Sequence, residues 1–510
     1  MARLGPFWMI LLGLPPLVAL AVLPAFGQRM VTLVGVYALM GLGYQLVFGR
    51  LGGLNLAQGA LFGLGAYAAA LAAPSLGAAA LLVSVLAAAI PAALVAAPLL
   101  RLQSHYFALA TLALASLVNL AAVHAEPLTG GANGLAGFAG FLPRGPLLLC
   151  LVWICVLAGV MAYAEIFSGP AGEASRLLRE APLVAATLGI DGGLWRLVAF
   201  VAGGALAGLA GGFSAAVSGV VSPEATGFPI MVLCLTSVVL GGTRHPMGAV
   251  IGAALAVCLP ELMRGLQGAW LLAYAVATLV VVLWAPAGLA GLVDRLLGRG
   301  AIMPTPLGLP DVVAPVEGPQ WLVLEGVTKR FGGVEALADV SFEVARGEIV
   351  GLIGPNGSGK TTLLNVVCGL ERADGGRIAL DGLRVDHLPA HRVARAGIAR
   401  SFQATMLPGD TKEADIARAV ATGAAFVLLD EPAAGSGERE RARLEAFVRR
   451  LRDTGRGVVI VDHDIELLSR LCDRLVCLER GAVIASGTPD IVRADRQVRA
   501  SFLGGEAATP

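Results

Sequence analysis

Lysine is absent from residues 1–292, a stretch that carries only ten arginines and seven acidic residues. The other 218 residues hold 56 of the 73 charged side chains. The whole chain is 56% hydrophobic and 14% charged, with a mean hydropathy of +0.77. These values exclude a uniformly soluble protein and indicate a membrane-embedded module followed by a soluble one. The formal net charge of +1 gives no indication of a nucleic-acid partner, and we expect none.

The chain also lacks a metal-binding or redox arrangement of cysteines. Its seven cysteines form no CxxC pair, and we expect buried free thiols in a reducing compartment. The apolar runs contain no Asp, Glu or His relay of the kind that a proton-coupled pump needs, and Glu261 stands near the end of its run.

What the first half does contain is a series of apolar runs, most of them near the 20 residues that cross a bilayer. We predict about ten spans, at residues 7–26, 30–49, 56–73, 77–100, 106–124, 146–165, 195–219, 228–242, 246–263 and 269–287. Residues 1–295 are thus predicted to form a polytopic α-helical membrane domain, in which Gly and Ala allow close helix packing. A signal peptide over residues 1–27 is the alternative for the first run.

The distribution of arginine predicts the orientation of these spans. With the N-terminus in the cytoplasm, nine arginines up to Arg299 fall on the cytoplasmic side and three fall outside. We therefore expect both termini in the cytoplasm and residues 125–145 outside.

Polar side chains are rare within the runs, and in lipid they must find partners. They are Gln45, Asn55, Gln58, Thr111, Ser116, Asn119, Thr236 and Ser237. They either line a substrate path or join one helix to another. Residues 166–194 are charged instead, and "ASRLLREAPLVAATLGI" predicts one or two short amphipathic helices interrupted at Pro182 and ending at Gly189. This segment is either a solvated loop or a coupling element that docks on the soluble half.

Several separate blocks of the first half occur in an order typical of one family. Among them are "YALMGLGYQLVFGRLGGLNLAQGALFGLGAY", "LTGGANGLAGF" and "SPEATGFPIMVLCLTSVVLGGTRHPMGAVIGA". Over nearly all of residues 30–292 the chain resembles a permease of the branched-chain amino acid ABC importer family.

The soluble half follows a proline-containing linker, which we place at residues 296–320. Within it, "GPNGSGKTT" matches G-x-x-x-x-G-K-[ST] between an expected strand, "EIVGLI", and an expected helix, "TTLLNVVCGL". Backbone N–H groups of such a loop close around phosphate oxygens. Lys360 would reach the β- and γ-phosphates, and Thr361 would coordinate Mg²⁺. The nucleotide-binding residues predicted here are Gly354, Asn356, Gly357, Ser358, Gly359, Lys360, Thr361 and Thr362.

Two later apolar strands end in polar residues suited to ATP chemistry. "FVLLDEP" ends in Asp430, expected to hold Mg²⁺, and Glu431, expected to polarise the attacking water. "VVIVDHD" ends in His463, expected near the γ-phosphate. Glu431 and His463 are therefore the candidate catalytic residues, and the fold predicted for residues 321–510 is an α/β P-loop NTPase domain.

This half resembles an ABC ATPase of the same importer family. The resemblance implies that Phe331 stacks on adenine and that Gln403 in "RSFQ" senses both Mg²⁺ and the permease. It also departs from the family at one place. Only residues 404–406 stand where a helical sub-domain of several dozen residues is expected, and Leu407-Pro408-Gly409 replaces an intact signature motif. We thus expect a truncated ABC domain with an internal deletion; the alternative for this stretch is a plain helix start with Asp410 and Glu413 as a capping pair.

Together these features predict a fused permease–ATPase subunit that imports branched-chain or similar small amino acids across a bacterial inner membrane, with its multi-pass domain in lipid and its ATPase domain in the cytoplasm. ATP and Mg²⁺ are the expected cofactors. The resemblance implies three partners: a second permease, a second ATPase with an intact signature, and a periplasmic substrate-binding protein. Two alternatives stay open: an ATP-binding but hydrolysis-deficient ABC subunit, and a secondary carrier or channel regulated by a nucleotide-binding domain.

Overall fold

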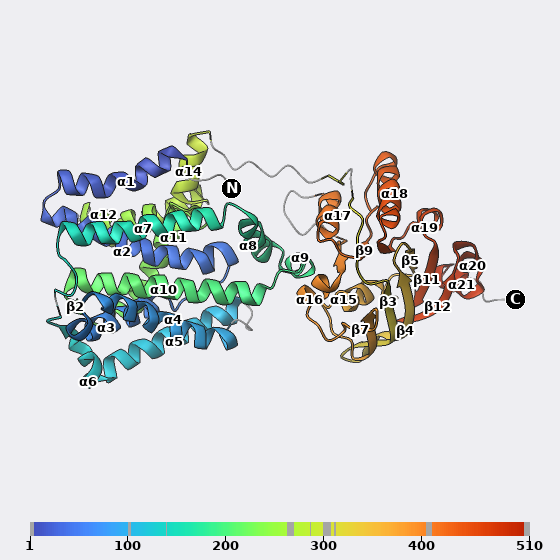
Figure 1. Ribbon diagram of the computed structural model, residues 1–510, viewed down its shortest axis with the longest axis horizontal. Helices are drawn as coiled ribbons and strands as arrows, with labels where there is room; N and C mark the ends of the chain where they lie inside the picture. Colours follow the sequence, from blue (N-terminus) through green and yellow to red (C-terminus); the bar gives the residue numbers. More distant parts are fainter. Residues whose placement is uncertain are drawn as a thin grey trace. The chain divides into compact units, whose positions relative to one another are not determined.

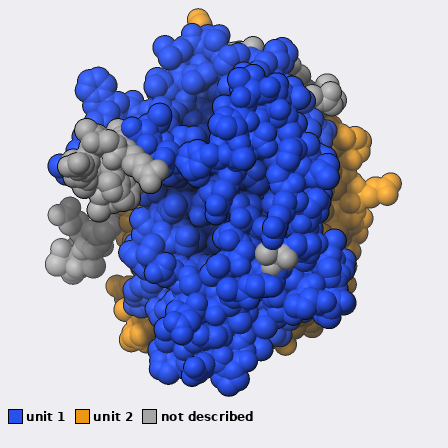
Figure 2. Space-filling view, turned by 90° about the vertical axis from the view of Figure 1, so that its left-hand side faces the viewer, with its two compact units in different colours: residues 1–179, 193–302 blue, residues 180–192, 303–510 orange. Residues whose placement is uncertain are grey.

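The computed structural model describes residues 5–99, 104–138, 140–262, 270–285, 287–298, 308–310, 313–403 and 411–503. The chain divides into two compact units. Unit 1 comprises residues 1–179 and 193–302, and unit 2 comprises residues 180–192 and 303–510 (Figure 2).

Unit 1 is almost entirely helical, as its long apolar runs predict (Figure 1). Its helices are α1 (Pro6–Ala21), α2 (Ala25–Tyr44), the π-helix η1 (Gln45–Gly49), α3 (Gln58–Leu76), η2 (Gly77–Ala79), α4 (Ala80–Leu99), α5 (Ser104–His124), α6 (Glu126–Thr129), η3 (Gly131–Asn133), α7 (Pro146–Ile166), α8 (Pro170–Glu180), α10 (Gly192–Ser218), η4 (Pro223–Thr226), α11 (Phe228–Gly241), α12 (Gly248–Leu262), α13 (Trp270–Trp284) and α14 (Gly288–Leu296). Two short strands, β1 (Leu135–Ala136) and β2 (Val220–Val221), pair antiparallel.

Every predicted span overlaps one of these helices, but not all of the helices are long enough to cross a membrane. Five helical segments of the described chain are long and apolar enough, namely Ala25–Gly49, Gln58–Ala96, His105–His124, Pro146–Ile166 and Gly192–Ser218. A bent pair within α13 and α14 would make a sixth, and α1, α11 and α12 are shorter apolar helices. Unit 1 is thus a membrane-type helical region, while the count of ten spans is not confirmed.

Small residues set the helix spacing in unit 1. A side chain added at Gly65 of α3 would collide with the backbone of Gly208 in α10, so the two helices approach as closely as glycine permits. The buried polar groups join such helices. Gln58 Nε2 donates to Gly203 O at 3.0 Å, and Gln45 Nε2 donates to Gly242 O at 2.7 Å. For these two glutamines the helix-joining role is therefore the observed one.

Unit 2 is built on two β-sheets (Figure 1). Its strands are β3 (Trp321–Phe331), β4 (Val334–Ala345), β5 (Ile349–Ile353), β6 (Gly375–Leu380), β7 (Leu383–Arg384), β8 (Ile398–Arg400), β9 (Phe426–Asp430), β10 (Gly457–Val461), β11 (Arg474–Glu479) and β12 (Ala482–Gly487). Its helices are α9 (Pro182–Thr187), α15 (Lys360–Val367), α16 (Ala390–Ala396), α17 (Lys412–Ala421), α18 (Glu438–Asp453), α19 (Ile465–Leu471), α20 (Pro489–Ala494) and α21 (Arg496–Leu503).

The larger sheet has the order β12-β11-β5-β10-β9-β8 and is parallel except for β12. Strands β5, β9 and β10 are fully buried apolar runs, as expected for a parallel sheet covered on both faces. Their carboxyl ends meet at one edge, where Val461 of β10 pairs with Asp430 of β9. Ligands of open α/β sheets bind at this kind of edge.

Part of the predicted linker is packed against unit 2 rather than extended in solvent. Val316 N donates to Thr454 O at 3.1 Å, and Arg456 Nη1 donates to Ala314 O at 2.8 Å. These bonds attach the chain ahead of β3 to the loop between α18 and β10.

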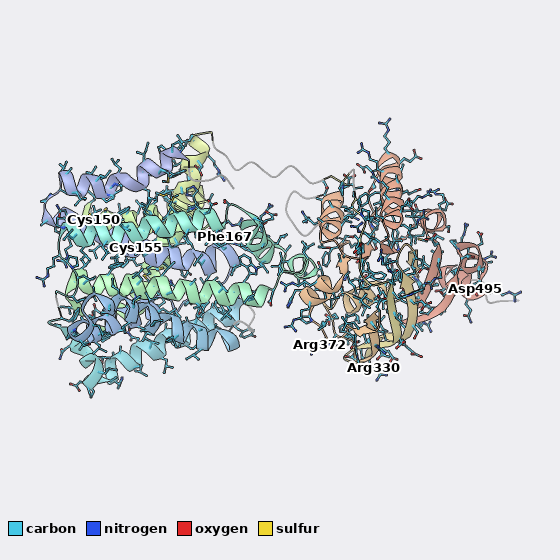
Figure 3. All side chains as sticks on the ribbon, viewed as in Figure 1. Cys150, Cys155, Phe167, Arg330, Arg372 and Asp495 are labelled. Atoms are coloured by element: carbon cyan, nitrogen blue, oxygen red, sulfur yellow. The ribbon has the colours of Figure 1, made fainter. Side chains whose placement is uncertain are left out.

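The cysteines match the expectation only in part. All seven are free thiols, and Cys234, Cys368, Cys472 and Cys477 are buried. Cys150 and Cys155 lie on α7 (Figure 3) and are half-buried, and Cys258 is exposed. The prediction that all were buried is therefore wrong for the α7 pair and for Cys258, because these residues lie on faces of apolar helices that unit 1 does not itself cover.

Candidate nucleotide and coupling site

The loop between β5 and α15 has the backbone of a phosphate-binding loop. Gly354, Gly357 and Gly359 have φ values of 149°, 82° and 103°, which L side chains rarely adopt. Helix α15 then begins at Lys360 with no side-chain cap, so its first N–H groups remain available to an anion. Glycine is therefore required here by conformation, in the order that the motif predicts.

Lys360 lies over this loop. Its Nζ donates to Gly354 O at 2.7 Å and to Pro355 O at 2.9 Å. Burial lowers the pKa of Lys360, and the charges of Glu431 and Asp430 oppose that effect. The Lys360 ammonium therefore interacts electrostatically with the two acidic residues at the end of β9. Thr361 and Thr362 follow in the first turn of α15, the former exposed and the latter half-buried.

Asp430 is held by a residue that the sequence analysis did not single out. Arg400 Nη2 donates to Asp430 Oδ2 at 2.8 Å, and both side chains are at most 3% exposed. Arg400 Nη1 also donates to Asn365 Oδ1, and it lies 3.7 Å from Cys368 Sγ. The guanidinium thus ties strands β8 and β9 to the helix that follows the phosphate loop. In the sequence, the hint of this role is that Arg400 is a charged residue at the end of an apolar strand, three positions before Gln403.

The structure brings together three of the predicted site residues, Glu431, Gln403 and His463. Gln403 Nε2 donates to Glu431 Oε2 at 2.8 Å, and His463 Nε2 lies 2.7 Å from Glu431 Oε1. Glu431 has a φ of 45°, unusual for a residue with a side chain. Its backbone is fixed by a bond from Glu431 N to Val461 O at 2.8 Å and by Lys412 Nζ on its carbonyl at 2.7 Å. A strained backbone held this firmly is typical of functional positions.

Phe331 stands at the end of β3, with 46% of its surface exposed. The hairpin that it begins returns along β4, where Ala336 lies against Gly359 of the phosphate loop. Lys329 Nζ lies 5.1 Å from the Phe331 ring centroid. An exposed ring on a hairpin that reaches the phosphate loop is open to stacking by a planar base.

Helix α17 follows the segment in which the signature motif is expected. Residues 404–410, which include the expected deletion, Leu407-Pro408-Gly409 and Asp410, lie outside the described residues. The N-cap is Thr411, whose side chain accepts from Ala414 N, so the expectation of a cap at Asp410 is wrong by one residue. Asp415 Oδ2 accepts from Phe402 N at 2.7 Å and anchors α17 to the chain beside Gln403.

Segment 180–192 belongs to unit 2 and packs on α16. Arg395 Nε donates to Gly189 O at 3.0 Å, and His391 Nε2 lies 3.4 Å from Asp191 Oδ2. Helix α9 also contacts β8, the strand that leads to Gln403. The expectation of a docking element, rather than a solvated loop, is therefore met by α9 and the residues after it.

The geometry defines a P-loop ATPase unit in the same chain as a membrane-type helical unit, which is the make-up of an ABC transporter with a fused permease. Residues 28–285 match the family described as branched-chain amino acid transport system / permease component. The chain belongs to this family. Residues 337–413 match the ABC transporter family, and residues 482–508 match the branched-chain amino acid ATP-binding cassette transporter family.

Individual relatives align with the ATPase unit. A probable ABC transporter ATP-binding protein of Azorhizobium caulinodans is 34% identical over 230 residues, covering 36% of this chain and 82% of the relative. The high-affinity branched-chain amino acid transport ATP-binding protein BraF of Pseudomonas aeruginosa is 29% identical over 248 residues, covering 36% of this chain and 97% of BraF. A crystal structure of a nucleotide-free ATP-binding cassette from an ABC transporter is 24% identical, with a TM-score of 0.34, and covers 36% of this chain and 99% of that structure.

The BraF alignment also contains more positions than this chain supplies. The alignment is 248 positions long, but it covers only 36% of the 510 residues of this chain, which is about 184 residues. The relative therefore has roughly 60 more residues over this range than the present chain.

Proposed function

We propose that this chain is a fused permease–ATPase subunit that uses ATP to import branched-chain or similar small amino acids across a bacterial inner membrane. One observation carries the proposal: a region of the branched-chain permease family shares its chain with a phosphate loop and with the converging side chains of Gln403, Glu431 and His463. The name of BraF, to which the ATPase unit is similar, agrees with this substrate class.

The residues at the sheet edge are suited to Mg-ATP. Lys360 would pair with the β- and γ-phosphates, and the exposed ring of Phe331 would stack on adenine. Hydroxyl, amide and carboxylate oxygens are the donors that Mg²⁺ prefers, and Thr361, Gln403 and Asp430 offer one of each. Because Arg400 holds Oδ2 of Asp430, Oδ1 is the oxygen we assign to the cation. When bound, Mg²⁺ would neutralise charge on the phosphates.

Glu431 would accept a proton from the attacking water, and His463 would contact the γ-phosphate. The two side chains already lie within hydrogen-bond distance, with Glu431 between His463 and Gln403. The imidazole is 54% exposed, whereas the glutamate is 13% exposed. Glu431 would thereby be held at the sheet edge, while the more exposed His463 would be accessible to a ligand.

A second candidate is an ATP-binding subunit that hydrolyses ATP poorly by itself. Strand β8 ends at Arg400 and α17 begins at Lys412, so only residues 401–411 join them. A helical sub-domain of several dozen residues does not fit in that length, and the extra positions in BraF point the same way. The domain limits that we propose are 1–295, 296–320 and 321–510, with the deletion near residues 404–406.

The proposed partners rest on the permease and ABC transporter families that the chain matches, and the missing signature motif adds a reason for a second ATPase. A second ATPase with an intact signature would complete the site at Lys360 and Glu431, a second permease would pair with unit 1 in the lipid, and a periplasmic protein would deliver the substrate. With the ten spans that we propose for unit 1, the arginine distribution supports a cytoplasmic ATPase unit.

Uptake of labelled leucine by cells that express the chain with its partner subunits tests the proposal. ATP-driven import predicts uptake that survives a protonophore while cellular ATP is held constant and that is lost in Lys360→Ala. Uptake that collapses with the proton gradient at constant ATP would instead favour a secondary carrier with a regulatory nucleotide domain.

A further inference from the structure

A cavity of about 220 Å³ lies in unit 1 among helices from three distant parts of the sequence. Ala60 lines it from the first turn of α3, Ala115 and Asn119 line it from α5, and Thr226 and Met231 line it from η4 and α11. Because α3, α5 and α11 are all apolar helices of the permease region, a cavity among them lies within the part of the chain that would be in the membrane.

One wall of this cavity is polar. Asn119 Nδ2 donates to Pro223 O at 2.9 Å and to Thr226 Oγ1 at 2.8 Å, and Thr226 is 1% exposed. Ser116, one helical turn earlier on α5, also lines the cavity and is exposed in the isolated chain. Ser116 Oγ donates to Leu112 O at 3.1 Å, so its lone pairs remain to accept a hydrogen bond from a ligand.

The rest of the lining is largely apolar. Leu56, Leu112, Leu120 and Met231 contribute aliphatic or thioether groups. The Nδ2 hydrogens of Asn119 are both used within the protein, so the cavity offers hydroxyl and amide oxygens that can accept hydrogen bonds, next to hydrophobic side chains. A zwitterionic amino acid with an aliphatic side chain likewise combines an ammonium group, which donates hydrogen bonds, with an apolar end.

We propose that this α3–α5–α11 cavity is a binding subsite for the transported amino acid on its way through the permease, and that it selects for aliphatic side-chain size. The proposal rests on the function proposed above. The polar end of the substrate meets Ser116 and Asn119, and its side chain meets the leucines and Met231.

A cavity-filling variant tests the subsite without removing any hydrogen bond. Ala115→Leu places a larger side chain in the cavity, whereas Ala113→Leu makes the same change at an exposed position about 200° around α5. Uptake of labelled leucine and labelled alanine would be measured for both variants in cells that express the full chain with its partner subunits, and normalised to the amount of chain in the membrane.

We expect Ala115→Leu to lower leucine uptake at least tenfold and alanine uptake by a smaller factor, and Ala113→Leu to leave both within twofold of the unmodified chain. A defect in folding or assembly would lower both substrates equally, so an unchanged leucine-to-alanine ratio in Ala115→Leu overturns the subsite. Full leucine uptake by Ala115→Leu also overturns it. If the unmodified chain imports neither amino acid, the proposed function itself has failed.

Discussion

The buried pair Arg400–Asp430 offers a quantitative test of how the ATPase site is held together. Both side chains are at most 3% exposed and their polar atoms are 2.8 Å apart. Replacing Arg400 with Met removes the charge and leaves a buried carboxylate without its cation, which typically costs about 3–5 kcal/mol. Asp430→Asn leaves the guanidinium unpaired and should cost a similar amount. Combining the two removes both charges, so the double variant should be at least ~2 kcal/mol more stable than the sum of the single losses predicts.

Unfolding of unit 2 can be followed through its own thiols, because Cys472 and Cys477 are buried. The full chain in detergent, without nucleotide, would be exposed to increasing urea and briefly labelled with a maleimide, and the two cysteines would be read by peptide mass spectrometry. With a slope of about 2 kcal/mol per molar urea, a loss of 3–5 kcal/mol lowers the midpoint by about 1.5–2.5 M.

Arg330→Met is the matched control, because Arg330 pairs with Glu335 at 2.9 Å but is 68% exposed. Surface pairs contribute about 0–1 kcal/mol, so the midpoint should move little. If Arg400→Met shifts the midpoint no more than Arg330→Met, or if the losses in the double variant simply add, the reasoning about this pair is refuted.

The remaining predictions concern the ligand, the coupling contact and the topology. Lys360→Ala should weaken Mg-ATP binding about 10- to 100-fold in isothermal titration, because a charge-assisted bond contributes about 1.5–3 kcal/mol; equal affinity would remove Lys360 from the site. Burial lowers the pKa of Lys360, so the ammonium loses its proton at a pH below the ordinary lysine pKa of about 10.4. The affinity of the unmodified chain for Mg-ATP should therefore fall as the pH rises through that lowered pKa, and Lys360→Ala should show no such fall. Arg395→Ala combined with His391→Ala should lower substrate uptake while ATP binding stays the same, since both residues contact segment 180–192; unchanged uptake would argue against coupling there. A reporter fused after Pro510 should be active in the cytoplasm, and activity confined to the periplasm would contradict the orientation.

The sequence predicts the local parts of this structure well, because local rules produce them. The helix positions in unit 1 follow from apolar runs, and the loop at Gly354–Lys360 follows from glycine spacing. Asp430, Glu431 and His463 were placed at strand ends because buried parallel strands read as continuous apolar runs.

Contacts between residues that are far apart in the sequence cannot be predicted from such local patterns. Gln45 bonds to Gly242, which is 197 positions away, and nothing in the residues around Gln45 specifies that partner. Arg400 reads as an ordinary strand-end charge until the sheet order places β8 beside β9. The α3–α5–α11 cavity also depends on how separate helices pack, and Ser116 and Asn119 could be identified from the sequence only as polar residues within apolar runs.

Phosphate release by the full chain is the measurement that tests the central claim most directly. The purified chain would be assayed alone and together with a partner ATPase that has an intact signature motif, each with and without Glu431→Gln in the chain. Losing one preorganised group at the γ-phosphate commonly costs about 10²–10³ in rate, so we expect very slow turnover by the chain alone. With the partner we expect turnover that Glu431→Gln in the chain abolishes. Fast turnover by the chain alone, or turnover with the partner that Glu431→Gln leaves intact, would contradict the account.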